Sequence, residues 1–190
     1  MVGSPVSTAH DPLLASKTAL VQAAVRSIPD FPKPGILFRD ITPVLADRVA
    51  FAAAADLHVA AAAALGEPLD VVLGIESRGF LFGATLATRL GLGFVPARKP
   101  GKLPGRVHEE HYGLEYGEAT LQVHDDGLAP GSRVLIVDDL LATGGTAGAA
   151  MRLVERSRAT TVGCLFLIEL DDLGGRQRLG DVPVSTILHY

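Results

Sequence analysis

Two adjacent aspartates and a threonine–glycine loop stand out between residues 134 and 146. The apolar run VLIV leads directly to Asp138 and Asp139, and TGGT follows at 143–146, before a stretch of small residues. The apolar run predicts a buried strand, and the small residues after the loop predict a helix. Free N–H groups and the dipole at the start of such a helix favour an anion, most naturally a phosphate monoester. The carboxylates suit a different group, either the two hydroxyls of a vicinal diol or a divalent cation.

A diol close to a phosphate describes a ribose 5-phosphate, and other phosphate-binding loops do not match. The sequence has no GxxxxGK[ST] loop, and no GxGxxG lies between a strand and a helix, which disfavours a dinucleotide-binding fold. A simpler interpretation makes Gly144 and Gly145 the corner of a tight turn and both acids solvated surface residues. An apolar strand, paired acids and TGGT at the start of a helix together are more specific than a lone TGGT, and they favour the binding site.

Short apolar segments alternate with helical segments along most of the chain, which predicts an α/β fold with a parallel sheet covered on both faces. We expect five strands, at residues 69–75, 92–97, 133–137, 161–170 and 183–190. We expect helices beginning at Asp11-Pro12 and covering 47–65, 79–91 and about 145–156. In an open parallel sheet, ligands bind beyond the carboxyl ends of the strands, which is where Asp138 and Asp139 are expected.

The chain has 190 residues and is expected to form one domain over residues 11–190, after a flexible tail at 1–10. Three prolines and a glycine predict a loop at 28–35. Residues 98–123 interrupt the alternation with a basic part rich in glycine and proline, followed by the alternating EATLQV. We expect a mobile excursion that returns through a β-ribbon.

The composition is that of an ordinary globular protein, with 48% hydrophobic and 20% charged residues. A net charge of −4 argues against a partner such as nucleic acid or an anionic membrane. The N-terminus lacks the pattern of a signal peptide, and Asp56 and His58 interrupt the most apolar stretch, so we expect a cytoplasmic protein. Cys164, the only cysteine, lies in an apolar run and is expected to be buried.

The segment VLIVDDLLATGGT resembles the phosphoribosyl-pyrophosphate signature of the type I phosphoribosyltransferases. Four further segments are similar to the adenine phosphoribosyltransferase family: IPDFPKPGILFRDITPVL, GIESRGFLFG, ARKPGKLPG and LEYG. The match runs in order from about residue 28 to the C-terminus. It implies the type I phosphoribosyltransferase fold, a Rossmann-like parallel-sheet core with an N-terminal hood at about 28–45 and a mobile catalytic loop at about 98–120.

This family of glycosyltransferases joins adenine N9 to the 5-phosphoribosyl group of phosphoribosyl pyrophosphate, which gives AMP and pyrophosphate in purine salvage. The resemblance implies that Asp138 and Asp139 hold the ribose hydroxyls and that the following loop holds the 5-phosphate. The loop residues concerned are Ala142, Thr143, Gly144, Gly145 and Thr146. Negative charge near the sugar also suits the oxocarbenium-like state through which the sugar passes.

The resemblance implies a pyrophosphate site in the basic segment ARKPGKLPG, through Arg98, Lys99 and Lys102. Arg78, in GIESRG, is implied to be a catalytic residue that reaches the pyrophosphate in the neighbouring subunit's site, which implies a homodimer. Mg²⁺ is the implied cofactor, bound mainly through the substrate diphosphate, whose departure it assists. Glu76 stands where the family usually has Asp.

Glu115 and Tyr116 lie in LEYG, on the predicted excursion. A loop glutamate is ordinarily solvated, but in the family this loop closes over the substrates and its glutamate is the proposed acid/base. The neighbouring RVHEEHYG departs from the family pattern. By composition, its polar residues could form a metal site, but a solvated loop tip is the simpler interpretation. These residues are His108, Glu109, Glu110 and His111.

The adenine site is implied by the segment ILFRD. Phe38 would stack on the purine, main-chain groups of Leu37 and Arg39 would read its edge, and Leu170 would cover its other face. A carbonyl acceptor favours the 6-amino group of adenine, because a 6-oxopurine would leave buried polar groups unsatisfied. Without the resemblance, Phe38 and Leu170 would be interpreted as core residues.

Three alternative functions remain open. A 6-oxopurine or orotate phosphoribosyltransferase would share the phosphate loop, but the hood segment and LEYG argue against it. A regulator that senses phosphoribosyl pyrophosphate would carry a winged helix ahead of the domain, and only about 27 residues precede the hood here. A generic sugar-phosphate binder would bind its ligand without turnover.

Overall fold

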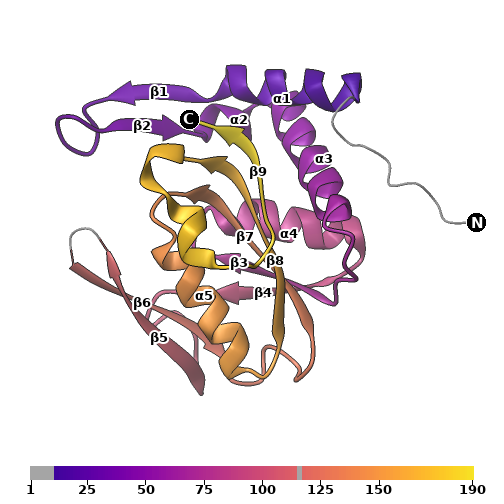
Figure 1. Cartoon of the computed structure of the whole chain (residues 1–190), viewed down its shortest axis with the longest axis vertical. Coiled ribbons are helices and arrows are strands. Elements are labelled where there is room, and N and C mark those ends of the chain that lie inside the picture. The colour runs from indigo at the N-terminus through magenta and orange to yellow at the C-terminus, as the bar shows by residue number, and fades with distance from the viewer. Residues whose placement is uncertain (1–10, 115–116) are drawn as a thin grey trace, which may run out of the picture. The chain divides into compact units, whose positions relative to one another are not determined.

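The computed structural model describes residues 11–114 and 117–190 (Figure 1). The chain divides into two compact units, one ending at Leu57 and one spanning His58–Tyr190. Helix α3 (Arg48–Ala64), the predicted alanine-rich helix, crosses the boundary between them. The predicted tail and the predicted loop residues Glu115 and Tyr116 lie outside the described residues.

The first unit combines helices with one antiparallel ribbon. Its elements before α3 are α1 (Pro12–Ala24), β1 (Arg26–Pro29), β2 (Leu37–Asp40) and α2 (Thr42–Ala46). Asp11 caps α1 as predicted, because its carboxylate accepts a hydrogen bond from the N–H of Leu13 at 2.9 Å. The predicted loop at 28–35 is wrong at its start, since Pro29 ends β1 and pairs with Leu37. Proline is tolerated there because the ribbon has an open edge.

The second unit is built on a parallel sheet with the strand order β4–β3–β7–β8–β9. These strands are β3 (Val71–Ile75), β4 (Gly93–Ala97), β7 (Arg133–Leu141), β8 (Thr160–Glu169) and β9 (Val184–His189). The predicted α/β parallel sheet is therefore confirmed. One boundary is wrong, because β7 continues four residues beyond the predicted end at 137, so Asp138 and Asp139 lie within the strand.

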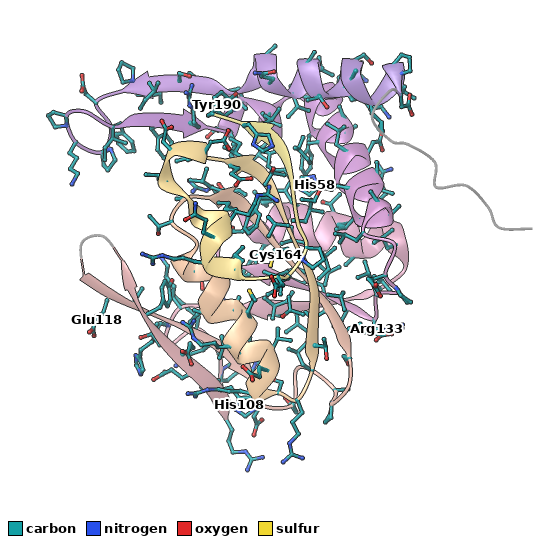
Figure 2. All side chains as sticks on the ribbon, viewed as in Figure 1. His58, His108, Glu118, Arg133, Cys164 and Tyr190 are labelled. Carbon is teal, nitrogen blue, oxygen red and sulfur yellow. The ribbon has the colours of Figure 1, made fainter. Side chains whose placement is uncertain are left out.

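Two helices cover opposite faces of this sheet (Figure 1). α5 (Gly145–Arg156) packs its apolar side against alternate strand residues such as Ile136, Cys164 and Phe166. α4 (Gly79–Leu90) packs on the face that carries Val137, and it ends at Gly91, whose φ of 67° lies in the left-handed region. Figure 2 shows Cys164 inside the unit, where burial raises the pKa of its thiol to about 12.

The excursion between β4 and β7 contains an antiparallel ribbon of β5 (Val107–Leu114) and β6 (Gly117–His124). The predicted return through a ribbon is confirmed. The interpretation of HEEHYG as a solvated loop tip is wrong, because residues 108–113 belong to β5 and pair with β6. Along residues 11–114 and 117–190, no helix is both long and apolar enough to cross a bilayer.

Candidate functional site

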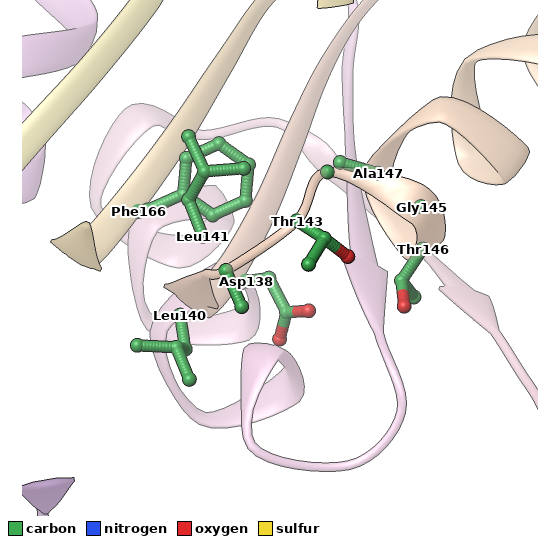
Figure 3. Close-up of a pocket in the computed structure, with 10 residues that line it drawn as sticks. Asp138, Leu140, Leu141, Thr143, Gly145, Thr146, Ala147 and Phe166 are labelled. Atoms are coloured by element: carbon green, nitrogen blue, oxygen red, sulfur yellow. The ribbon is translucent and has the colours of Figure 1, made fainter. Parts of the chain in front are cut away.

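The TGGT loop surrounds a small pocket where β7 ends and α5 begins (Figure 3). The pocket has a volume of about 120 Å³. Figure 3 shows Asp138, Thr143 and Thr146 presenting oxygen atoms toward the same space. The first N–H groups of α5 have no acceptor within the helix, and no side chain caps them. The pocket can therefore hold a phosphate group, as predicted from the sequence.

The conformation of this loop depends on two glycines that touch each other. Gly144 precedes α5 with a φ of 79°, a left-handed conformation that favours glycine. A methyl group at Gly144 would overlap the carbonyl oxygen of Gly175, and one at Gly175 would overlap the carbonyl oxygen of Ala142. The loop is thus held by backbone contact with a segment thirty residues further along the chain, which the sequence did not predict.

Gly175 begins the short helix η3 (Gly175–Leu179), which an ion pair fixes to the sheet. Arg176 lies 2.6 Å from the carboxylate of Glu169, which is 6% exposed at the end of β8, and also donates to the carbonyl oxygen of Val184 at 2.6 Å. These contacts place Gly175 under the phosphate loop. The glycine pair at 174–175, which follows soon after β8, was the only signal in the sequence that could have indicated this support.

A second, larger pocket of about 520 Å³ adjoins the first. The two share four lining residues, which are Asp138, Leu140, Ala142 and Thr146. Its wall also contains the ionisable side chains of Glu76, Arg78, Lys99 and Asp139, together with Tyr112 of the ribbon. Its volume lies in the usual range for small-molecule sites. The arrangement offers a phosphate pocket, then paired carboxylates, then cations for a second anionic group.

The paired carboxylates contact the start of α4. Arg78 lies 2.6 Å from the carboxylate of Asp139, and Asp138 accepts a hydrogen bond from the N–H of Asp139 at 2.9 Å. The next residue, Gly79, lets the helix approach the strand closely. A methyl group there would lie 2.7 Å from the carbonyl oxygen of Val137 and 2.8 Å from the carboxylate of Asp138. The structure therefore places Arg78 beside the carboxylates of its own chain.

Burial raises the pKa of both acids. Desolvation and the neighbouring negative charge of Asp139 raise the pKa of Asp138 well above its ordinary value. Desolvation also raises the pKa of Asp139, although the guanidinium of Arg78 acts in the opposite direction. Hydroxyl groups of a bound sugar would donate hydrogen bonds to these carboxylates and so offset part of their desolvation.

Replacing Asp138 with asparagine is expected to stabilise the free protein at alkaline pH and to reduce ligand binding. The folded-state pKa lies above that of the unfolded chain, so the folded protein binds more protons between the two values. Its stability therefore falls as the pH rises through that window. Each pKa unit corresponds to about 1.4 kcal/mol. In thermal unfolding without ligand, the melting temperature of Asp138→Asn should exceed that of the unmodified protein more at pH 8 than at pH 5. Identical pH dependence in both proteins would contradict this assignment.

The predicted pyrophosphate residues separate into two groups. Lys99 lines the larger pocket, whereas Arg98 pairs with Glu76 at 3.3 Å and donates to the carbonyl oxygen of Lys102 at 3.3 Å. Burial alone would raise the pKa of Glu76, but the N–H of Lys99 and the guanidinium of Arg98 lower it overall. Glu76, the departure from the family pattern, thus keeps its charge and orients the backbone that carries Lys99. Lys102 is exposed in the following turn.

The residues predicted to bind adenine occupy two places in the chain. Leu37, Phe38 and Arg39 belong to β2 of the first unit, where the ring of Phe38 contacts that of Phe31 at 5.1 Å between centroids. Leu170 belongs to the second unit and donates its N–H to the carbonyl oxygen of Leu141 at the end of β7. Their roles toward adenine stay a prediction, as does the role of Glu115 and Tyr116.

Potential metal ligands gather elsewhere in the part of the chain that the structure describes. Glu169, Asp171 and His189 form the one group found there with metal-site spacing. Both acids already have partners, since Glu169 pairs with Arg176 and Asp171 lies 2.9 Å from Nδ1 of His189. The metal site suggested by the composition of HEEH is not formed among these described residues.

The chain as a whole is similar to proteins of known family. Residues 45–187 match the profile of the phosphoribosyl transferase domain. An adenine phosphoribosyltransferase of Thermosynechococcus vestitus is 52% identical over 170 residues, which cover 90% of this chain and 99% of that protein. A crystal structure of adenine phosphoribosyltransferase from Thermoanaerobacter pseudethanolicus has a TM-score of 0.88 at 46% identity, covering 91% and 99% of the two chains. The Saccharomyces cerevisiae enzyme complexed with an imino-altritol bisphosphate and adenine has a TM-score of 0.87 at 43% identity, covering 92% and 99%.

Proposed function

The chain belongs to the adenine phosphoribosyltransferase family, and we propose how its residues divide the reaction of that family among them. The reaction transfers the 5-phosphoribosyl group of phosphoribosyl pyrophosphate to adenine. A bond forms between N9 of adenine and C1′ of the sugar, and the bond from C1′ to the pyrophosphate oxygen breaks. N9 loses its proton, and the products are AMP and pyrophosphate.

The observation that supports this function best is the pair of adjoining pockets. The small pocket beneath the first turn of α5 takes the 5-phosphate, and the two carboxylates at its mouth accept hydrogen bonds from the ribose hydroxyls. The larger pocket then receives the pyrophosphate beside Arg78 and Lys99. Phosphoribosyl pyrophosphate carries its two anionic groups on opposite sides of a diol, which is the order in which the site presents complementary groups.

Mg²⁺ fits this site as a companion of the diphosphate. Asp138 and Asp139 are oxygen ligands of the kind that Mg²⁺ accepts, but Asp139 is already paired with Arg78. We therefore assign Mg²⁺ mainly to the substrate, where it would neutralise the charge of the departing pyrophosphate. Lys99 and Arg78 supply the protein's share of that neutralisation, and Arg98 and Lys102 support the segment that carries Lys99.

We assign adenine to Phe38, with the main chain of Leu37 and Arg39 reading its edge and Leu170 covering its other face. The complex of the yeast relative with adenine supports a purine-base substrate. We assign Glu115 the acid/base role, with Tyr116 beside it in the loop. A homodimer in the cytoplasm is part of the same proposal, and it rests on the family resemblance of the sequence.

A panel of bases tests the function. With phosphoribosyl pyrophosphate and Mg²⁺, we expect AMP and pyrophosphate from adenine, and turnover of hypoxanthine, guanine and orotate slower by about 10⁴-fold. The reason is that a site which accepts a hydrogen bond from a 6-amino group leaves buried polar groups unpaired when a 6-oxo base binds. Separation of the nucleotides by chromatography measures each product.

Each other outcome of the panel identifies a different function. Formation of IMP, GMP or orotidylate would show that the site reads another base. Binding of phosphoribosyl pyrophosphate without turnover of any base would contradict the enzyme assignment and indicate a sensor.

A further inference from the structure

The ribbon of β5 and β6 is tied at one side to the segment that follows β4. The N–H of Arg98 donates to the carbonyl oxygen of Gln122 at 2.8 Å, and the N–H of Gln122 donates back to that of Arg98 at 2.7 Å. The side chain of Gln122 is buried and donates to Glu109 on the paired strand. The ribbon is thus continuous with the backbone that presents Lys99 to the larger pocket.

The other side of the ribbon is attached to α5 by Glu110. Its carboxylate lies 2.5 Å from Nε of Arg152 and 3.4 Å from Nη2 of Arg156, one helical turn further on. Arg156 also donates through Nη1 to the carbonyl oxygen of Glu109 at 2.7 Å. The side chain of Glu110 is only 13% exposed, so this contact is better shielded from water than a typical surface ion pair. Figure 1 shows the ribbon running beside α5.

The same strand reaches the phosphate loop two residues after Glu110. Tyr112 follows Glu110 on the same face of β5, because side chains alternate along a strand. A methyl group at Gly145 would lie 3.6 Å from the ring of Tyr112 and 3.2 Å from the carbonyl oxygen of Gly113. Tyr112 also lines the larger pocket. The position of β5 along α5 therefore sets how closely Tyr112 lies to the phosphate loop and to any ligand held there.

We propose that Glu110 is a positioning residue for phosphoribosyl pyrophosphate: its contacts with Arg152 and Arg156 hold Tyr112 and Gly113 against the phosphate loop. This inference rests on the proposed function. It gives the HEEH segment, the part of the ribbon that departs from the family pattern, a role in substrate binding. The carboxylate of Glu110 is thus one of the contacts that join the helix beginning at the phosphate loop to the strand that passes beside this loop.

Glu110→Gln tests this role because it removes the charge and keeps the shape. We expect KM for phosphoribosyl pyrophosphate to rise about tenfold, with kcat and KM for adenine each changing less than about threefold. Arg152→Gln should raise this KM by a similar factor. The double variant should raise it by less than the product of the two single factors, because both substitutions break the same contact. Asp125→Asn is the matched control, since Asp125 pairs with Arg106 at 2.8 Å near the opposite end of the same ribbon. That variant should leave both KM values unchanged.

Two measurements separate this role from a merely structural one and from failure of the proposed function. Thermal unfolding measures any general loss of stability. A lower melting temperature with unchanged KM for phosphoribosyl pyrophosphate would overturn the proposal. Calorimetric binding of phosphoribosyl pyrophosphate without adenine needs no turnover. If the unmodified protein binds this ligand without forming AMP, the proposed function fails, while weaker binding by Glu110→Gln would still support the positioning role. Equal affinity of both proteins would overturn it.

Discussion

Gly175→Ala is expected to lower kcat/KM for phosphoribosyl pyrophosphate by about 10²–10³-fold, because it displaces several backbone donors of the phosphate loop together. The added methyl group would overlap the carbonyl oxygen of Ala142 and would lie 3.0 Å from the backbone nitrogen of Gly144. Both neighbours are backbone atoms, so neither can move aside by rotating a side chain. Steady-state kinetics measure the loss, and calorimetry should show it as weaker binding of phosphoribosyl pyrophosphate.

Gly93→Ala is the matched control for this substitution. Gly93 starts the edge strand β4, where a methyl group would lie 3.8 Å from a side-chain carbon of Val71, an ordinary packing distance. We expect this variant to keep normal kinetics. If Gly175→Ala keeps normal affinity as well, the phosphate loop does not depend on its contact with η3, and the pocket must bind its ligand in another conformation.

Arg78→Ala is expected to lower kcat/KM by about 10²–10³-fold, since it removes a preorganised cation from the place where pyrophosphate departs. The substitution also leaves the carboxylate of Asp139, whose side chain is 9% exposed, without its partner at 2.6 Å. Loss of that positive charge raises the pKa of Asp139 further, so the acid limb of the pH profile of kcat/KM should move to higher pH. Profiles from pH 5 to 9 measure both effects, and Arg78→Lys should recover part of the rate.

The control breaks a different arginine–aspartate pair, at the other end of strands β3 and β7. Arg133, at the start of β7, lies 2.7 Å from Asp70, whose side chain is 41% exposed. Arg133→Ala should keep full activity and lose at most about 1 kcal/mol of stability. An Arg78→Ala variant with normal kcat/KM and an unmoved pH profile would refute the assigned role.

In the proposed homodimer, mixed dimers of Arg78→Ala and Gly175→Ala chains would decide which subunit Arg78 serves. The guanidinium contacts Asp139 of its own chain, so we expect Arg78 to act in that chain's site. Each site of the mixed dimer would then contain one of the two substitutions, and activity would not recover. If Arg78 instead reaches the neighbouring subunit, as the sequence resemblance implies, both defects fall in one site of the mixed dimer. The other site would then be intact, and AMP formation would recover.

Much of the fold could be predicted because the second unit follows simple sequence rules. The strand at Val71–Ile75 is uniformly apolar, as a strand covered on both faces requires, and Gly91 marks the end of α4 with the conformation that glycine favours. The first site residues followed from the same rules. An apolar run followed by paired acids and a glycine-rich helix start was enough to predict an anion pocket near Asp138, which lines the pocket found there, although the strand itself continues to Leu141.

The remaining features depend on contacts that no local pattern records. The strand β5 carries charged residues at Glu109 and Glu110, and polar contacts with Gln122 and Arg152 stabilise it. Hydrophobic periodicity therefore did not indicate a strand in this segment. Gly175 supports the phosphate loop from thirty residues downstream. Its role depends on where η3 passes, which tertiary structure alone determines.

Cys164 has a practical consequence for experiments on this protein. The thiol is completely buried in β8, and its pKa of about 12 keeps it almost entirely un-ionised near neutral pH. A thiol reagent can therefore react with it only when the sheet opens. The alkylation rate of the unmodified chain thus measures how readily this part of the structure unfolds. Since the sequence has no other cysteine, one introduced on the surface would accept a fluorophore at a single defined position.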